Sequence, residues 1–452
     1  MLWRVLHRLG LHRDPTLRVL RLAYPVVLGS LSFTLLTVVD TAMLGRLGSV
    51  PLAASGVAGV LFFAVVFPLS SVSVGTQTLV SRRFGERRDA ECGEVLGSGL
   101  ALAVAIGIPL VASAPWLSQL IAPFLSDDPE VTKLGTVYVH LRMYGAAFMF
   151  MNFVFRGFYA GIAETRQQMI SSILITASNI LLDYLLIFGR AGFPRLGIAG
   201  AALASTLATG VGTVYFVVVT LMPRYRRYVR GLRFPSIRRW VRPILRLSAP
   251  VIGQRVLSHG SWFIFFAVVA RIGTLELAAT NVIRSIYHLS IMVAIGLGTA
   301  ASALVGQQLG AGRPDDAEVL AWEAAKLAAY AMTAVGLLFI FAPRWVFLIY
   351  TSDPAVLDAG RLSLLILGFV QAFAGVALVL SQALQGAGNT RFVMIAEMIV
   401  CLGLYIPIVY FLGLKTRLGL VGAWTAEYAY WGALAGLMTW KFRQGRWKEI
   451  VV

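Results

Sequence analysis

The chain has 452 residues, of which 58% are hydrophobic and only 13% are charged. Soluble domains contain about 25% charged residues, so this composition excludes a soluble globular protein and indicates a membrane protein. The net charge of +18 is compatible with nucleic-acid binding. However, the basic residues are concentrated in a minority of the loops, and we therefore expect no nucleic-acid partner.

Apolar segments recur along the whole chain, and each is long enough to cross a hydrocarbon core about 30 Å thick. The loops between them are short, which leaves no room for an inserted soluble domain. The sequence therefore predicts an all-α polytopic membrane protein with twelve transmembrane helices. The predicted spans are 20–44, 52–80, 94–121, 133–159, 167–189, 197–222, 245–271, 277–306, 318–349, 357–384, 391–413 and 419–441.

Most Lys and Arg residues lie in the N-terminal segment, the even-numbered loops and the C-terminus. By the positive-inside rule, both termini should be cytoplasmic in a plasma (inner) membrane. Residues 1–19 are predicted to form a cytoplasmic or interfacial segment, and residues 442–452 a cytoplasmic tail. The strongly basic stretch 223–244 is predicted to be a cytoplasmic linker that contacts anionic lipid.

The two halves of the sequence are similar at an offset of 225 residues. L-A-Y-P-V at 22–26 aligns with L-S-A-P-V at 247–251, and G-I-A-E-T-R at 161–166 aligns with G-A-G-N-T-R at 386–391. Near the end, R-L-G-I-A-G-A from Arg195 aligns with R-L-G-L-V-G-A from Arg417 at an offset of 222.

Six spans per repeat place both halves in the same orientation. We therefore expect two pseudo-twofold-related six-helix bundles, 20–222 and 245–441, around a central cavity, as in secondary transporters. Prolines inside the predicted spans would supply kinks; they are Pro25, Pro68, Pro109, Pro250 and Pro407.

The sequence contains no nucleotide-binding loop, no zinc-protease motif and no nucleophile elbow. Cys92 and Cys401 offer neither a disulfide framework nor a metal motif. We therefore expect neither an enzyme nor a cofactor. Transport would have to be coupled to an ion gradient, which requires ionisable groups inside the spans.

The first half has two such acids, Asp40 in span one and Asp183 in span five, at a similar predicted depth. Asn179 lies one helical turn from Asp183, and Tyr138 and Ser205 reach a comparable depth from spans four and six. The five residues could hold a proton between the carboxylates. Asp40, Asn179 and Asp183 could alternatively ligate Na⁺, and the residues alone leave both ions open.

A simpler interpretation is that the two acids only cap helix ends or pair with Arg46 and Arg190. Because an intramembrane acid that faces a polar stripe is a functional site by default, we favour the ion-coupling hypothesis.

The second half carries no counterpart of these acids, since Asp40 aligns with Phe265 and Asp183 with Ile408. Ion chemistry is therefore predicted in one half only. Other polar, charged and methionine side chains in the spans could line a substrate cavity, or the charged ones could form internal ion pairs. These candidates are Met149, Asn152, Arg255, His259, Arg284, His288, Gln371 and Glu427, with Gln382, Gln385 and Glu397 nearby in sequence.

Several stretches in chain order resemble the multidrug and toxic compound extrusion (MATE) family, closest to its prokaryotic DinF-like branch. They are V-D-T-A-M-L-G-R-L-G from Val39, S-R-R-F-G-E from Ser81, N-I-L-L-D at 179–183 and L-G-I-A-G-A-A-L-A from Leu196.

The resemblance implies an antiporter that expels organic compounds in exchange for H⁺ or Na⁺. We expect a monomer that exports cationic or amphipathic compounds, and we prefer H⁺ as the coupling ion. The resemblance also implies that Asp40, Tyr138, Asn179 and Asp183 form the coupling site and that the first helix bends at Pro25. Related members often have Thr where this chain has Ser205, so the hydroxyl is retained. A flippase for lipid-linked oligosaccharides and a facilitator-type transporter are the alternatives.

Overall fold

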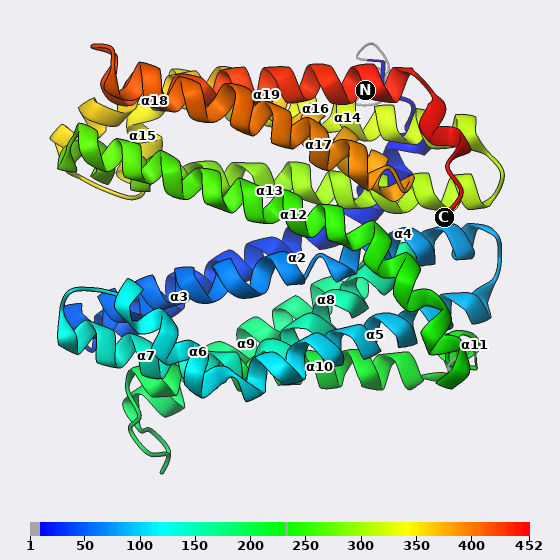
Figure 1. Cartoon of the computed structure of the whole chain (residues 1–452), viewed down its shortest axis with the longest axis horizontal. Coiled ribbons are helices and arrows are strands. Elements are labelled where there is room, and N and C mark those ends of the chain that lie inside the picture. The colour runs from blue at the N-terminus through cyan, green and yellow to red at the C-terminus, as the bar shows by residue number, and fades with distance from the viewer. Residues whose placement is uncertain (1–9, 231–233) are drawn as a thin grey trace. The chain divides into compact units, whose positions relative to one another are not determined.

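The computed structural model describes residues 10–230 and 234–452, with the side chains of 234–237 left out. The predicted N-terminal interfacial segment lies in part, at residues 1–9, outside the described residues. The regular structure of the described chain is helical (Figure 1). Its helices in the first half are α2 (Arg13–Gly45), α3 (Ser49–Leu69), α4 (Val72–Gly85), α5 (Asp89–Ala112), α6 (Ala114–Ile121), α7 (Pro129–Met143), α8 (Ala146–Gly161), α9 (Arg166–Phe188), α10 (Ile198–Leu221) and the short α11 (Arg226–Val229).

The helices that follow are α12 (Phe234–Ile272), α13 (Thr274–Gly310), α14 (Pro314–Phe341), α15 (Pro343–Leu348), α16 (Pro354–Gly386), α17 (Thr390–Val400), α18 (Ile406–Leu414) and α19 (Gly419–Arg443). A π-helical turn, Cys401–Tyr405, joins α17 to α18.

Ten helical segments of the described chain are long and apolar enough to cross a membrane. They correspond to ten of the twelve predicted spans. One of the other two predicted spans is α19. The other is formed by α7, of 15 residues, and α8, of 16 residues, which are separated at 144–145. The prediction of an all-α multi-pass membrane protein is confirmed.

Interruptions of the predicted spans occur close to prolines. Span two is broken between α3 and α4 just after Pro68, and α5 ends three residues after Pro109. The π-helical turn of span eleven ends two residues before Pro407. Proline lacks a backbone N–H and its ring clashes with the preceding turn, so it weakens the hydrogen-bond ladder on its N-terminal side. The π-helical turn before Pro407 fits this effect, whereas the helix continues through Pro25 and Pro250.

The chain packs as two compact units, one of Leu28–Ile252 and one of the chain up to Val27 together with Gly253–Val452. The boundaries of the predicted bundles come from the sequence repeat, whereas the boundaries of these units come from packing contacts. Both unit boundaries fall inside helices, in α2 and α12, and each lies two residues after one of the aligned prolines, Pro25 and Pro250. Each of these two helices therefore contributes to both units.

The first part of α2 packs on helices of the second half. The backbone N–H of His12 donates to Glu323 Oε1 of α14 (3.0 Å), and Lys326 Nζ donates to the carbonyl of Gly10. A Cβ on Gly296 of α13 would lie only 2.5 Å from Val27 Cγ2, so glycine permits the close approach of α13 and α2. The N-terminal part of span one is thus anchored on α13 and α14.

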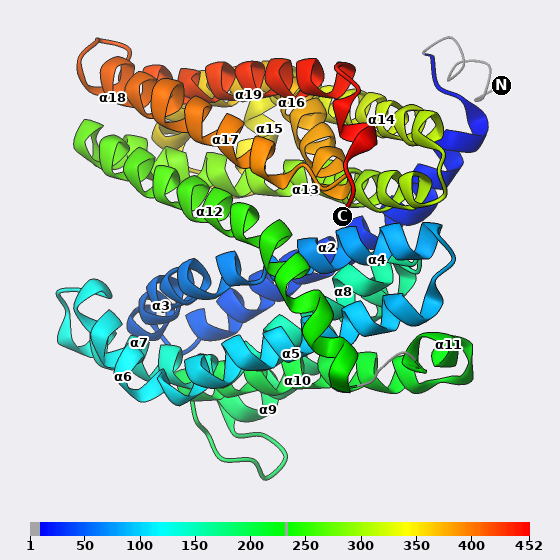
Figure 2. The same cartoon turned by 45° about the vertical axis from the view of Figure 1, so that its right-hand side comes forward.

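The first part of α12 is anchored in the corresponding way on α4 and α5 (Figure 2). Trp240 is buried and donates from Nε1 to Glu94 Oε2 of α5 (2.9 Å). A Cβ on Gly75 of α4 would come within 2.6 Å of the Ile244 carbonyl oxygen. Residues 234–244 of the predicted linker are therefore the first residues of α12.

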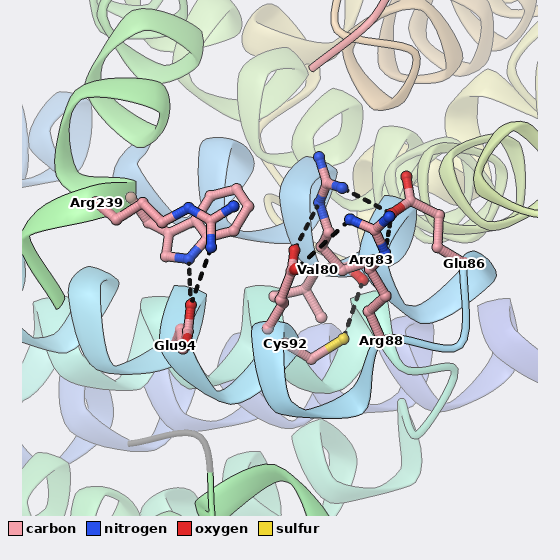
Figure 3. A network of polar contacts seen from close by, with 9 residues as sticks. Val80, Arg83, Glu86, Arg88, Cys92, Glu94 and Arg239 are labelled. Atoms are coloured by element: carbon pink, nitrogen blue, oxygen red, sulfur yellow. Dashed lines mark hydrogen bonds and ion pairs between the residues drawn. The ribbon is translucent and has the colours of Figure 1, made fainter. Parts of the chain in front are cut away.

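Ionic contacts surround this anchor, as Figure 3 shows for Glu94, Arg239 and Arg83. The guanidinium groups of Arg83 and Arg239 lie 5.2 and 5.0 Å from the centroid of the Trp240 ring. Arg83 is itself paired with Glu86 (2.6 Å). Cation–π contacts of this kind add to the apolar burial of the indole.

We expect Trp240→Phe to lower the free energy of unfolding by about 1.5 to 3 kcal/mol, because it removes the hydrogen bond to the charged Glu94. Thermal denaturation in detergent measures this effect. Trp116→Phe is the matched control, since Trp116 on α6 is 72% exposed. Equal losses in the two variants would contradict the anchoring role of Trp240.

Helices α14 and α16 cross where Gly336 meets Gly368. A Cβ on Gly336 would overlap the Gly368 carbonyl oxygen, and a Cβ on Gly368 would lie 2.8 Å from the Gly336 carbonyl oxygen. Small residues at such crossings let the helix backbones approach closely in a membrane.

We expect Gly336→Ala to destabilise the protein by about 1–3 kcal/mol through overpacking. Gly432→Ala in α19 is the control, because no atom lies within 4 Å of a Cβ at that position. Unfolding in a denaturant series measures both variants, and a Gly336→Ala protein as stable as the control would contradict the close crossing.

Candidate functional site

The structure brings together the five residues predicted to form the ion-coupling site. Asp40 lies on α2, Tyr138 on α7, Asn179 and Asp183 on α9, and Ser205 on α10. The buried polar residues of α9 include Ser172, Thr176, Asn179 and Asp183. Their 4, 3, 4 spacing places them on one side of the helix.

Asn179 connects the two acids to α10. With its Nδ2 turned toward the carboxyl groups, Asn179 donates to Asp183 Oδ2 (3.1 Å) and Asp40 Oδ1 (3.0 Å). Its Oδ1 then accepts from Ser205 Oγ (3.2 Å) and from the Ser205 backbone N–H (3.0 Å). This orientation pairs every donor with an acceptor, whereas the opposite one would turn the amide oxygen toward the carboxylate oxygens. The amide therefore bridges both acids.

The carboxyl groups of Asp40 and Asp183 also lie within hydrogen-bonding reach of each other. Two carboxyl groups make such a bond only when one of them carries a proton, because an ionised carboxylate is solely an acceptor. Asp183 is fully buried, and its Oδ1 has no hydrogen-bond partner among the described residues. Asp40 is half-buried. The pair thus has one unpaired, buried oxygen that could receive a proton or a cation.

Arg142, which is not among the predicted site residues, is a charged side chain beside the two acids. It is hydrogen-bonded to Tyr138, interacts electrostatically with Asp40 and Asp183, and lies over the Phe62 ring at 5.0 Å. Its signal in the sequence is a basic residue inside span four, four residues after Tyr138 and thus on the same helix face. Among the described residues, Arg142 and not Arg46 or Arg190 is the arginine that acts electrostatically on these acids.

An apolar cluster covers the site toward the predicted outer ends of the helices. Leu44, Ile187 and Ala201 lie one turn from Asp40, Asp183 and Ser205 and are buried in this cluster with Ala54, Val131 and Ile198. Tyr138 packs against the same cluster. The acids are therefore separated from that end of the bundle by packed aliphatic side chains.

In the opposite direction, polar groups continue along α9. Thr176 Oγ1 donates to the Ser32 carbonyl of α2 (3.2 Å), and Arg156 Nη2 donates to Ser172 Oγ (2.9 Å). Gln168 Nε2 donates to the Arg156 carbonyl (2.7 Å). The first-half site thus has an apolar side and a polar side.

Pro25 is buried inside α2, and helix continues on both sides of it. It precedes the point at which α2 passes from one packing unit to the other.

Of the predicted cavity residues in the first half, Met149 is half-buried on α8. Asn152 is buried and uses both ends of its amide for contacts with α10. Its Nδ2 donates to the Thr209 carbonyl (2.9 Å), and its Oδ1 accepts from Thr213 Oγ1 (3.0 Å). Asn152 therefore joins two helices of its own unit.

The predicted cavity residues of the second half lie in different surroundings. Arg255 interacts electrostatically with Glu397, and a ring nitrogen of His259 is 2.8 Å from the Arg255 carbonyl oxygen. Arg284 and His288 are exposed on α13, where Arg284 lies over the Phe266 ring.

Gln371 and Glu427 are buried, and their contacts are uncharged. Gln371 Oε1 accepts from Ser290 Oγ (3.3 Å), and the contacts of Glu427 are with neutral tyrosine and tryptophan side chains. The ion-pair interpretation therefore fits Arg255 and not Glu427.

Among residues 10–230 and 234–452, no group of three or more His, Cys, Asp or Glu side chains could hold a metal ion. Sodium would accordingly have to be held by the mixed set of carboxylate, amide and hydroxyl oxygens around Asn179.

The sequence model of the MatE family matches this chain twice, at residues 25–185 and 250–411. The two matches begin at the aligned prolines and confirm the internal repeat. A solved structure described as the outward-facing conformation of a multidrug resistance MATE family transporter of the MOP superfamily superposes with a TM-score of 0.88. It is 22% identical, and 97% of each chain is covered. This likeness shows that the fold is shared.

Two curated relatives extend the similarity over nearly the full length. A probable multidrug resistance protein NorM of Thermotoga maritima is 26% identical over 96% of this chain and 93% of its own length. A multidrug resistance protein NorM of Burkholderia vietnamiensis is 29% identical over 93% of this chain and 92% of its own length. With both halves matched by the family's sequence model, the chain belongs to the MatE family.

Proposed function

We propose that this protein is a secondary antiporter that exports organic, cationic or amphipathic compounds of the multidrug type in exchange for an ion. The observation that carries the proposal is the buried pair of Asp40 and Asp183, bridged by Asn179 and left with one unpaired oxygen. Intramembrane acids with a defined partner set mark ion pathways in transporters. The relatives named as multidrug resistance proteins support the substrate class.

The proton is our preferred coupling ion, and Na⁺ is the second candidate. The two carboxyl groups lie within hydrogen-bonding reach of each other, and a proton shared between them would make that bond. A bare Na⁺ would instead need the proton to leave and several oxygens to turn toward one point.

Transport would proceed by alternating access, in which one half rocks against the other around a central cavity. A bend of α2 at Pro25 would move Asp40 relative to Asp183 on α9 and so make or break the carboxyl pair. The position of Pro25, close to where α2 passes between the packing units, supports this role.

The remaining finer assignments are also proposals. We place both termini in the cytoplasm and the basic stretch 223–244 against anionic lipid, and we expect a monomer in the inner membrane. The DinF-like branch rests on V-D-T-A at 39–42 and N-I-L-L-D at 179–183. A lipid-linked oligosaccharide flippase is disfavoured, because the first-half site is acidic and not cationic.

Transport in proteoliposomes with separately imposed pH and Na⁺ gradients tests the proposal, with ethidium as the transported probe. We expect a pH gradient alone to drive ethidium movement by the parent protein and not by Asp40→Asn. Equal movement by both proteins under both gradients would show that Asp40 is not a coupling residue.

A further inference from the structure

Two glutamates in the second half are buried in a polar cluster that plays no part in the first-half site. Glu397 lies on α17 and is 6% exposed, and Glu427 lies on α19 and is 3% exposed. Both belong to the same packing unit. A buried acid inside a membrane span is costly unless it carries a proton or has a charged partner.

Glu427 is surrounded by neutral hydrogen-bond donors. Trp431 Nε1 donates to Glu427 Oε2 (2.8 Å), and the Tyr287 hydroxyl of α13 donates to the same oxygen (3.4 Å). The hydroxyl of Tyr405, which is 4% exposed, lies within reach of the carboxyl group and has no hydrogen bond of regular geometry. The Tyr405 hydroxyl is therefore a third neutral donor available to Glu427.

Glu397 is held in a similar way by side chains of α12. Gln254 Nε2 donates to its Oε2 and Ser258 Oγ donates to its Oε1. Gln385 of α16 donates from Nε2 to Gln254 Oε1 (3.0 Å) and so extends the network. Arg255 is the cationic side chain that faces Glu397.

Tyr430 lies between the two glutamates on α19. It is hydrogen-bonded to Glu397 and close enough to interact electrostatically with Glu427. Cys401 faces the same space and is 2.7 Å from Ser261 Oγ of α12. Helix α16 faces this cluster with the uncharged Gln371, which connects to it through Ser290. The two acids therefore share one polar cluster built from α12, α13, α16, α17 and α19.

The position of Glu427 in the repeat resembles that of the first-half site. At the offset of 222 residues, Glu427 aligns with Ser205, which donates from its hydroxyl and its backbone N–H to Asn179 Oδ1. Phe265, at the position of Asp40, is fully buried and packs against Trp424 (5.0 Å between centroids) and Tyr405 (6.3 Å). Glu427 thus lies in the region of the second half that corresponds to the first-half site. It lies on the counterpart of α10 and not on the counterpart of α2, which carries Asp40.

We propose that Glu427 and Glu397 form a second proton-binding site, separate from Asp40 and Asp183. Burial favours the protonated carboxyl group, whereas the surrounding N–H and O–H donors stabilise the carboxylate. Glu427 can therefore load and release a proton without an accompanying charged group, whereas Glu397 does so beside Arg255. Such a site would place ion chemistry in both halves, whereas the sequence predicts it in one half only.

The donor set selects a proton over a metal cation. The contacts of Glu427 are an indole N–H and phenol O–H groups, which point their hydrogens at the carboxylate oxygens. Na⁺ would require oxygen acceptors at these positions. At Glu397 the nearby positive charge of Arg255 would also repel it.

Infrared difference spectroscopy of the purified protein tests the proposal without any transported substrate. Spectra at acidic minus alkaline pH, recorded in H₂O and D₂O, report carboxylic-acid C=O groups that gain a proton. We use Asp40→Asn/Asp183→Asn as the background, so that the first-half acids contribute nothing. We expect a buried carboxylic-acid band in this background that is lost in part on adding Glu427→Gln and in part on adding Glu397→Gln.

Glu130→Gln is the matched control, because Glu130 is exposed at the start of α7 and should leave the band unchanged. Glu427→Asp keeps a carboxyl group and should shift the band without removing it. A spectrum that Glu427→Gln and Glu397→Gln leave intact would overturn the proposal. A band that responds to NaCl at constant pH would overturn it in favour of a metal-cation site.

The indole of Trp431 gives a local second readout. Trp431→Phe identifies the part of the pH-dependent tryptophan fluorescence that comes from Trp431. Glu427→Gln should remove the same part of the pH dependence. Because neither measurement involves transport, both can fail while the proposed antiport is retained, and both can succeed if the antiport proposal fails.

Discussion

Asp183→Asn is expected to reduce ethidium export driven by a pH gradient to the level of protein-free vesicles. Asn has the shape of Asp and can keep the contact with Asn179, but it cannot bind and release a proton. Asp183 is fully buried and carries the unpaired oxygen of the site, so we expect its proton binding to be essential for coupling. Fluorescence of ethidium in proteoliposomes with an imposed pH gradient measures the rate.

Asp128→Asn is the matched control for this variant, because it makes the same chemical change in the same packing unit. Asp128 caps the N-terminus of α7, where its Oδ1 accepts from the Glu130 N–H (2.8 Å), and Asn is an equally good cap. Its transport rate should equal that of the parent. Export by Asp183→Asn at the rate of Asp128→Asn would contradict the assignment.

Asn179→Ala is expected to have the second largest effect, a reduction of transport by about 10- to 100-fold at unchanged expression. The amide makes two hydrogen bonds to the carboxyl groups. A hydrogen bond to a charged group contributes about 1.5–3 kcal/mol, and about 1.4 kcal/mol corresponds to a tenfold change in rate. Initial rates of ethidium export over a range of concentrations measure the loss.

Asn152→Ala separates loss of coupling from loss of stability. Asn152 is also a buried asparagine that bridges two helices, but its partners are Thr209 and Thr213 and no carboxyl group. It should lower the thermal stability as much as Asn179→Ala while leaving more of the pH-driven transport. If the two variants lost transport in proportion to stability, the special role of Asn179 would be wrong.

Much of the first-half site could be predicted because helical spacing alone determines which residues share a face. Asn179 and Asp183 are four residues apart, and their buried neighbours Ser172 and Thr176 follow the same period. The depth of Asp40 in its span placed it beside Asp183, because each predicted span crosses a layer of nearly constant thickness. The internal repeat was equally visible, since it depends on identity at a fixed offset.

Arg142 was not predicted, because a basic residue within a span has several explanations that periodicity does not separate. Whether such a side chain extends to the lipid interface or turns toward an acid depends on its rotamer and on neighbouring helices. In the structure it turns toward Tyr138 and the acids. The same limit applies to Asn179, whose bridging of both carboxyl groups depends on the orientation of one amide.

The packing of α2 and α12 could not be predicted from the repeat either. Residues of α2 up to Val27 belong by sequence to the first half but pack with the second-half unit. Residues of α12 up to Ile252 pack with the first-half unit. Contacts such as that of Trp240 with Glu94 join residues that are 146 positions apart. No local pattern encodes such a pairing.

In the second half, the sequence left open whether the charged residues pair with one another. The hydrogen-bond partners of Glu427 are the neutral side chains of Tyr287, Trp431 and Tyr405. They come from three separate parts of the chain, so the sequence does not show that they meet. Spacing identifies only the nearest of them, Trp431, which is four residues away on the same helix.

Substrate-driven proton movement is the most direct test of the central claim that the carboxyl pair of the first half couples export to protons. Proteoliposomes are loaded with ethidium and a pH-sensitive dye, and they start without a pH gradient. With the parent protein, ethidium leaving down its gradient should drive proton entry and acidify the lumen, whereas with Asp183→Asn the luminal pH should stay constant. Acidification by Asp183→Asn as fast as by the parent would contradict the account.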